Sequence, residues 1–202
     1  MIPIFPLPDV VLFPNVFLPL HIFEPRYKDM VRDSLAGDRI IGMVLLREKQ
    51  DTDVDGCSSV YSIGCAGLIT HYEQLKDGRY NIVLRGLHKF RILHEDLSRS
   101  YRQAQIDTVE ECHSAEELRE ARLRLDLSLE GRVLSNIPSK LSSNMDDGDL
   151  INALSQYLEF EPIEKQALLE RNGIVERCRG LSDLIEIQAL TDEGRFPVTH
   201  LQ

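Results

Sequence analysis

The sequence has no long hydrophobic run and no basic leader, and both absences exclude a class of protein. No stretch of about 18 apolar residues occurs in the 202-residue chain, which argues against a transmembrane helix. The first 14 residues, MIPIFPLPDVVLFP, are apolar but contain four prolines and no basic residue. A secretory signal peptide has a basic start and an uninterrupted apolar segment. We therefore expect a cytoplasmic protein.

The chain also has no surplus of basic residues. Its net charge is −10, with 13 basic and 15 acidic residues up to Glu110 and 10 basic and 18 acidic residues from Glu111 onward. Proteins that bind nucleic acid gain affinity when Lys and Arg side chains replace the counterions of the phosphate backbone. No basic cluster is present to do this, so the sequence argues against nucleic acid as a partner.

Metal-binding and nucleophilic motifs are missing as well. The four cysteines, Cys57, Cys65, Cys112 and Cys178, form no C-x-x-C pair, and the six histidines show no i, i+4 or H-x-H spacing. Structural zinc sites need ligands at such short spacings. No G-x-S-x-G sequence marks a serine nucleophile. We predict reduced structural thiols, no metal, no cofactor and no catalytic residue, although a site assembled from distant residues stays open at this stage.

The first half of the sequence is typical of β structure. Short runs of β-branched, aromatic and aliphatic residues are separated by Gly37, Asp55-Gly56, Asp77-Gly78 and Gly86. These runs predict strands at Met1–Phe5, Val10–Phe13, Val16–Ile22, Ile40–Leu46, Val60–His71, Tyr80–Leu84, Lys89–Leu93 and Arg102–Val109. Asp77-Gly78 suits a hairpin turn that needs positive φ angles. A small antiparallel barrel or sandwich is indicated, with one helix at about Pro25–Leu35.

The second half has helical periodicity. Ser114 followed by Glu117 predicts a capping box, and Leu150, Ala153, Leu154, Tyr157 and Leu158 lie on one helical face. Pro162 predicts the start of a further helix and Gly173 its end. The segment Asn136–Gly148, rich in Ser, Asn and Asp, is predicted to be a mobile loop. The expected fold is α+β, with a β-rich part at residues 1–112 and a helical part at 113–202.

Two charged clusters and several aromatic residues are candidates for binding. Glu24, Arg26 and Tyr27 suit a peptide-binding patch, but their place between a strand and a helix also gives each a structural role, which we favour. Asp77 and Gly78 are explained by turn chemistry, which leaves Arg79 as a weaker candidate. Large aromatic residues near the prolines, among them Phe13 and Phe17, are core residues by default and partner contacts where exposed.

Three stretches resemble one known family. The segment IPIFPLPDVVLFPNVFLPLHIFEPRYKDMV (2–31) is similar to the opening of the Lon N-terminal, or substrate-binding, domain. The segment LKDGRYNIVLRGLHKFRI (75–92) resembles that domain's second signature, with Lys89-Phe90 in place of an RF-like pair. The segment PIEKQALLERNGIVERCRGLSDLIE (162–186) resembles its closing helices. The resemblance implies a β-rich, PUA-like pseudo-barrel followed by a helical bundle.

The resemblance also implies a function. The chain has no G-x-x-x-x-G-K-[ST] phosphate loop and no Ser-Lys peptidase segment, so a non-catalytic, stand-alone Lon-domain protein is expected. It would bind extended or unfolded polypeptide and serve a protease or chaperone, with weak homo-oligomerisation an open possibility. An open strand edge would suit such binding. The alternatives are a PUA-like small-ligand or RNA-binding module and, less consistent with the sequence, an independent hydrolase.

Overall fold

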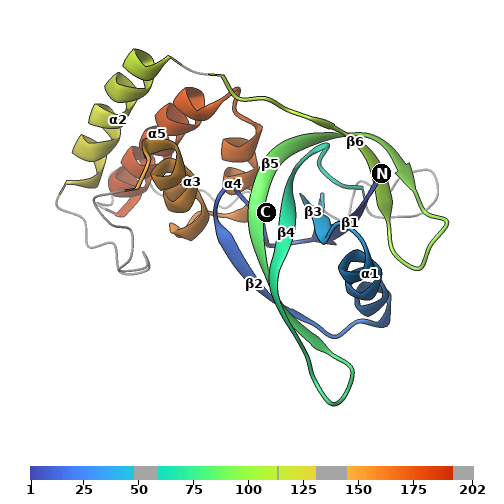
Figure 1. Cartoon of the computed structure of the whole chain (residues 1–202). Helices are drawn as coiled ribbons and strands as arrows, with labels where there is room; N and C mark the ends of the chain where they lie inside the picture. Colours follow the sequence, from blue (N-terminus) through green and yellow to red (C-terminus); the bar gives the residue numbers. More distant parts are fainter. Residues whose placement is uncertain (48–58, 113, 131–144, 193–202) are drawn as a thin grey trace, which may run out of the picture.

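The computed structural model describes residues 1–47, 59–112, 114–130 and 145–192, and strands precede most of its helices (Figure 1). The described strands are β1 (Ile2–Leu7), β2 (Phe17–Ile22), β3 (Ile40–Leu45), β4 (Ile63–Gln74), β5 (Tyr80–Asp96) and β6 (Gln103–Thr108). The helices are α1 (Pro25–Ala36), α2 (Ala115–Leu129), α3 (Asp147–Tyr157), α4 (Pro162–Glu170) and α5 (Ile174–Asp192). The α+β prediction is therefore confirmed, with one helix inside the β-rich half.

The strands form one sheet that closes on itself. Its order is β2-β5-β4-β3-β1-β6, and β5 also pairs with β6, which completes a ring. The long strand β5 makes this closure possible, because its first part pairs with β2 and its last part with β6. Among the described strand pairs, β1 and β3 alone are parallel. Strand β2 lies outside the ring, with β5 as its partner on one side.

The predicted hairpin at Asp77-Gly78 is confirmed. Gly78 has a φ of 79°, and the Leu75 N–H donates to the carbonyl oxygen of Arg79 at 2.8 Å. Gly86, in contrast, ends no strand, although the sequence predicts a break there. It lies within β5, and a glycine is needed there because the backbone of Phe13 passes close by. A Cβ on Gly86 would lie 2.0 Å from the Phe13 carbonyl oxygen.

A further prediction for the β half is wrong. The apolar run at residues 10–13 is not a strand; instead Val11 and Phe13 pack into one core and Leu12 into another. Successive side chains of this segment enter different cores, and a strand would show the same alternation of side-chain direction. Proline is typical of an edge or kinked strand, yet β1 lies between β3 and β6. Pro3 and Pro6 occupy positions where β1 has a pairing partner on one side.

The helical half follows the predicted periodicity. Helix α4 begins at Pro162, and Gly173, with a φ of 91°, precedes α5. Ser114 is the N-cap of α2 as expected, but its side chain makes no capping hydrogen bond. The reciprocal bond is found at α4 instead, where the Glu161 N–H donates to the Glu164 carboxylate at 2.8 Å. Residues 136–144 of the predicted mobile loop lie outside the described residues, and α3 starts at Asp147.

One hydrophobic core joins the barrel to the helices. Phe13, Val16, Leu45 and Ile63 from the β half pack with buried side chains of α2, α3, α4 and α5. A second core lies between α1 and the sheet. A third core takes one buried side chain from each of the five strands of the ring and fills the barrel: Ile4, Val44, Ala66, Phe90 and Ala104. The boundary between a β part and a helical part near residue 112 stays a prediction. The two parts share the first of these cores. Within the described residues, no helix has the length and apolar character needed to cross a bilayer.

Candidate functional site

Glu24, Arg26 and Tyr27 lie where β2 leads into α1. The Arg26 Nε donates to a Glu24 carboxylate oxygen at 3.0 Å, and the Arg26 guanidinium lies 4.4 Å from the centre of the Tyr27 ring. The Tyr27 side chain is buried, with its ring centre 4.3 Å from that of Phe5, and burial raises the pKa of its hydroxyl. Tyr27 thus belongs to the core between α1 and the sheet, whereas Glu24 and Arg26 remain at the surface.

Arg79 lies at the tip of the β4–β5 hairpin. Its guanidinium forms an ion pair with Asp77 at 2.7 Å, and Nη1 lies 3.2 Å from Nε2 of His21. The other ring nitrogen of His21, Nδ1, lies 2.7 Å from the side-chain oxygen of Asn81. These contacts connect the hairpin tip to β2, so the Arg79 side chain is held next to the surface of that strand.

The two candidate phenylalanines have opposite environments. Phe13 is fully buried between barrel and helices, with the Arg177 guanidinium 5.7 Å from its ring centre. Phe17 is 50% exposed at the start of β2. The six residues singled out in the sequence therefore do not converge on one cavity. Phe17 belongs to β2, and Arg79 contacts that strand through His21. Glu24 and Arg26 come directly after the strand in the sequence.

Strand β2 presents a free backbone edge, which we call the β2 edge. The Gly86 N–H donates to the Val16 carbonyl oxygen at 2.9 Å, so even-numbered residues of β2 direct their backbone groups toward β5. Phe17, Pro19 and His21 consequently direct theirs outward. No described strand pairs with this edge, although the Tyr157 hydroxyl donates to the Phe17 carbonyl oxygen at 3.2 Å.

Exposed aromatic residues lie along and just beyond the β2 edge. The side chains of Phe17, Pro19 and His21 are exposed, and Phe23 in the following loop is 61% exposed. The ring centres of His21 and Phe23 lie 6.3 Å apart in a stacked arrangement. A free strand edge beside exposed apolar side chains is the arrangement that accepts an extended peptide as an added strand.

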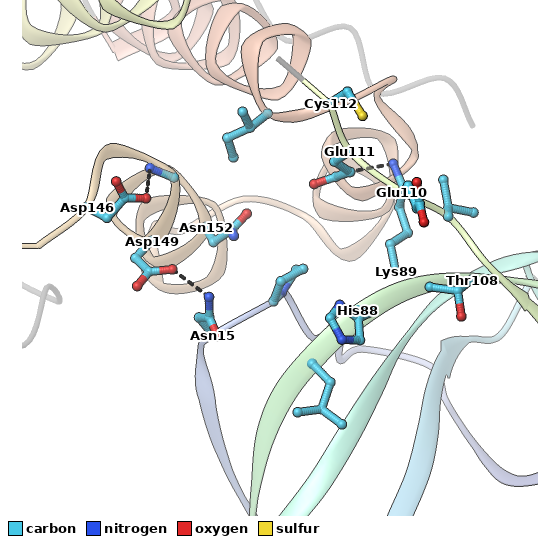
Figure 2. A pocket seen from close by; sticks show the side chains of 15 residues that line it. Asn15, His88, Lys89, Thr108, Glu110, Glu111, Cys112, Asp146, Asp149 and Asn152 are labelled. Atoms are coloured by element: carbon cyan, nitrogen blue, oxygen red, sulfur yellow. Dashed lines mark hydrogen bonds and ion pairs between the residues drawn. The ribbon is translucent and has the colours of Figure 1, made fainter. Parts of the chain in front are cut away.

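An open cleft of about 680 Å³ lies between barrel and helices (Figure 2). Asn15, which precedes β2, donates to the Asp149 carboxylate of α3 at 2.8 Å, and both residues line the cleft. His88 and Lys89 of β5 line the barrel side. The cleft therefore follows the junction at which the helical part rests on the barrel.

A buried group of charges lies at this junction and was missed in the sequence. Lys89 and Arg177, 3% and 0% exposed, both contact Glu111, at 2.8 Å and 2.5 Å. Lys89 also donates to the Arg171 carbonyl oxygen at 2.7 Å, and Arg177 to the Asn152 side-chain oxygen at 2.7 Å. The residues are distant in sequence, and a lysine in a β strand or an arginine in a helix ordinarily indicates a solvated surface.

Glu111 is the only carboxylate in direct contact with these two cations among the described residues. Burial by itself raises the pKa of the Glu111 carboxyl, but Arg177 and Lys89 outweigh that effect and leave the pKa lowered. Glu111 therefore stays ionised and compensates two buried cations. The cluster connects β5 to α5 and has the character of a structural joint.

The described residues contain no gathering of three or more His, Cys, Asp or Glu side chains suited to a metal ion. Cys65 and Cys178 are buried, and burial raises the pKa of the Cys65 thiol to about 12 and that of Cys178 to about 11. Both thiols are thus poor nucleophiles. Cys112 is exposed, and Cys57 lies outside the described residues.

Comparison with curated proteins finds Lon proteases. The chain is 30% identical to the Lon protease of Flavobacterium johnsoniae over 186 residues, which is 88% of this chain and 23% of that protein. It is 25% identical to the Lon protease of Escherichia coli over 192 residues, covering 92% of this chain and 24% of that protein. The chain thus spans about a quarter of the length of the curated relatives it matches.

Solved structures show the same fold. The N-terminal domain of the Mycobacterium avium complex Lon protease superposes with a TM-score of 0.69 at 16% identity, covering 92% of this chain and 97% of that chain. A Lon N-terminal domain protein from Xanthomonas campestris gives a TM-score of 0.58 at 19% identity, covering 93% and 96%. The family described as the ATP-dependent protease La (LON) substrate-binding domain matches residues 1–186. The chain belongs to the Lon substrate-binding domain family.

Proposed function

We propose that this chain is a non-enzymatic module that binds extended or unfolded polypeptide, with the β2 edge as its binding surface. The family supports binding of polypeptide substrates. The observation that carries the location is the free edge of β2 beside two phenylalanines that are each at least half exposed. Binding through backbone groups would depend little on the sequence of the polypeptide, as a protein that recognises many substrates requires.

The expected affinity follows from the small number of available groups. The β2 edge offers the N–H groups of Phe17 and His21 and the carbonyl groups of Pro19 and His21, because Pro19 has no N–H to donate. Each hydrogen bond contributes roughly 0.5–1.5 kcal/mol net. Burial of the exposed part of Phe17 adds roughly 1 kcal/mol. Even before the entropic cost of association is subtracted, these terms sum to roughly 3–7 kcal/mol, so a single segment is expected to bind no more tightly than roughly 10 µM.

Pro19 also explains how the edge remains unpaired in the free protein. A long regular edge strand invites pairing between copies of a chain, and a proline that removes one outward N–H weakens such pairing. An adaptor role in proteolysis or quality control, with delivery of the bound polypeptide to a protease or chaperone, completes the proposal. The net charge of −10 makes RNA the weaker alternative.

The direct experiment is an anisotropy titration with a fluorescently labelled, reduced and alkylated protein that cannot refold. We expect saturable binding of this unfolded protein and none of the same protein in its folded form. The Phe17→Ala variant is expected to bind about fivefold more weakly, because an exposed apolar anchor is lost. Leu93→Ala is the matched control, because Leu93 is 56% exposed on the far part of β5, where β6 is the partner.

Three results would count against the proposal. They are absence of binding to wild type at high micromolar concentration, equal binding of folded and unfolded protein, and equal weakening by Phe17→Ala and Leu93→Ala. Peptidase, esterase and ATPase assays on the same preparation test the non-enzymatic part. Turnover that co-purifies with the chain through every step would contradict it.

A further inference from the structure

A small depression of about 190 Å³ lies where the first turn of α1 meets the segment between β5 and β6, and no residue of β2 lines it. Its wall includes three arginine side chains, Arg26, Arg99 and Arg102, and no carboxylate residue. The apolar parts of its wall come from Pro6, Tyr27 and Leu97. Three cations around one small depression are notable in a chain with 23 basic and 33 acidic residues.

Carboxylates outside the depression hold these arginines in place. Glu24 pairs with Arg26 at 3.0 Å, and Glu95 lies 3.4 Å from Arg102. Asp33 lies 3.1 Å from Nη1 of Arg99. A guanidinium carries five N–H donors in a rigid plane, so a carboxylate on one side leaves donors on Arg26 and Arg99 for a second anion.

Helix α1 adds a further favourable field. Its N-cap is Glu24, whose side chain makes no capping hydrogen bond but pairs with Arg26, and the first turn, which has no acidic residue, supplies Arg26 and Tyr27 to the depression. The N-terminal end of a helix carries a partial positive charge that attracts anions. The three guanidinium groups and this helix end favour the same sign of ligand charge.

We propose that this depression, which we call the arginine pocket, binds a single carboxylate group of a polypeptide, from a C-terminus or from an Asp or Glu side chain. A carboxylate fits better than a phosphate for two reasons. Glu24, Asp33 and Glu95 already balance the three arginines, so a monoanion meets less repulsion than a dianion. The Leu97 and Pro6 side chains also provide apolar contact for the carbon atoms next to a carboxylate, which a free phosphate lacks. The arginine pocket is independent of the β2 edge.

The test uses small probes and side-chain NMR, so it does not depend on binding at the β2 edge. The Nε–Hε signals of Arg26 and Arg99 are followed at constant ionic strength during four titrations. The probes are N-acetyl-alanyl-alanine, its C-terminal amide, the α-amide of N-acetylglutamic acid, and inorganic phosphate. We expect saturable shifts with one or both carboxylate probes, in the millimolar range for so small a ligand, and none with the amide.

Variants decide whether the shifts report this site. Arg99→Gln and Arg26→Gln are each expected to weaken carboxylate binding about tenfold, because each removes charge-assisted hydrogen bonds. Arg179→Gln is the matched control: Arg179 is an exposed arginine of α5 that pairs with Glu176 and lies outside the pocket. Equal shifts with acid and amide, no response to any probe, a response to phosphate alone, or equal weakening by all three variants would overturn the proposal. The two carboxylate probes distinguish a C-terminus from a side chain.

Discussion

At the scale of single residues, one carboxylate determines whether two buried cations are tolerated. Lys89 and Arg177 are almost wholly removed from water, and Glu111 contacts both. A buried charge that loses its partner destabilises a protein far more than an exposed one, because neither water nor a counter-charge then compensates it. The joint between β5 and α5 therefore depends on Glu111 more than on any exposed ion pair of the chain.

We predict that Glu111→Gln lowers the free energy of unfolding by about 3–5 kcal/mol. The amide keeps the size of the side chain but leaves Lys89 and Arg177 without a counter-charge. Urea unfolding followed by circular dichroism measures the effect. Glu110→Gln is the control, since Glu110 is an exposed neighbour with the same charge, and a loss of similar size there would contradict the account.

The same contact predicts a dependence on pH. The pKa of Glu111 is lowered from its ordinary value of 4.5, so its ionised form contributes stability that is complete above that value and lost as pH falls through the lowered pKa. The difference in unfolding free energy between wild type and Glu111→Gln should accordingly be constant near neutral pH and shrink as the pH falls below about 4.5. A difference that grew on acidification would contradict this assignment.

Thiol chemistry provides a prediction for three other residues. Cys112 is exposed, whereas burial raises the pKa of Cys65 and Cys178 to about 12 and about 11. Alkylation of the folded protein near neutral pH, with the sites mapped by mass spectrometry, should modify Cys112 and leave Cys65 and Cys178 intact until denaturant is added. Rapid modification of either buried cysteine in the native protein would be inconsistent with the structure.

Sequence patterns predicted the roles of some single residues and not of others. The turn at Asp77-Gly78 was predictable because it follows from local backbone geometry. The Lys89–Glu111–Arg177 cluster was not, because its members come from a strand, the segment after β6 and the last helix. No local periodicity marks a buried cation whose partner is supplied by tertiary structure. The free β2 edge was not predicted either, because the order of strands in the sheet is set by tertiary structure.

At the scale of elements, Gly86 allows a close backbone approach within β5. From the sequence alone, such a glycine cannot be told from one that makes a turn. Glycine marks both chain reversals and close backbone approaches. Gly86 belongs to the second class, and β5 therefore runs unbroken from β2 to β6. That continuity closes the barrel and places Phe13 against the helices. The helices were easier to predict, because their apolar faces repeat at regular spacing along the chain.

Two glycine substitutions test this distinction. Gly86→Ala should cost about 3 kcal/mol of stability, because its Cβ would lie 2.0 Å from the Phe13 carbonyl oxygen and the backbone would have to move. Gly78→Ala meets no atom within 4 Å and should cost about 1 kcal/mol, from its φ of 79° alone. Urea unfolding compares the two variants. A smaller cost at Gly86 than at Gly78 would contradict the close approach.

At the scale of the whole molecule, the shared core makes the barrel and the helices depend on each other. Phe13 and Ile63 of the β half contribute to the same buried cluster as Leu125 and Leu181 of the helices. A part of the chain that lost its partner would expose this apolar surface to water. We infer that residues 1–112 and the helical part fold as one cooperative unit.

This inference predicts coincident unfolding transitions. Five of the six tyrosines lie before residue 112, so tyrosine fluorescence reports on the barrel, while far-ultraviolet circular dichroism is dominated by the helices. The two signals should give one urea midpoint. Separate midpoints, with the helical signal lost first, would mean that the shared core does not couple the two parts.

The measurement that tests the central claim most directly is NMR-detected amide hydrogen exchange along β2, with and without saturating unfolded protein. The account predicts slower exchange at Phe17 and His21, whose N–H groups face outward, and little change at Leu18 and Leu20, whose N–H groups already face β5. Unchanged exchange at Phe17 and His21 under saturation would contradict the β2 edge as the polypeptide-binding surface.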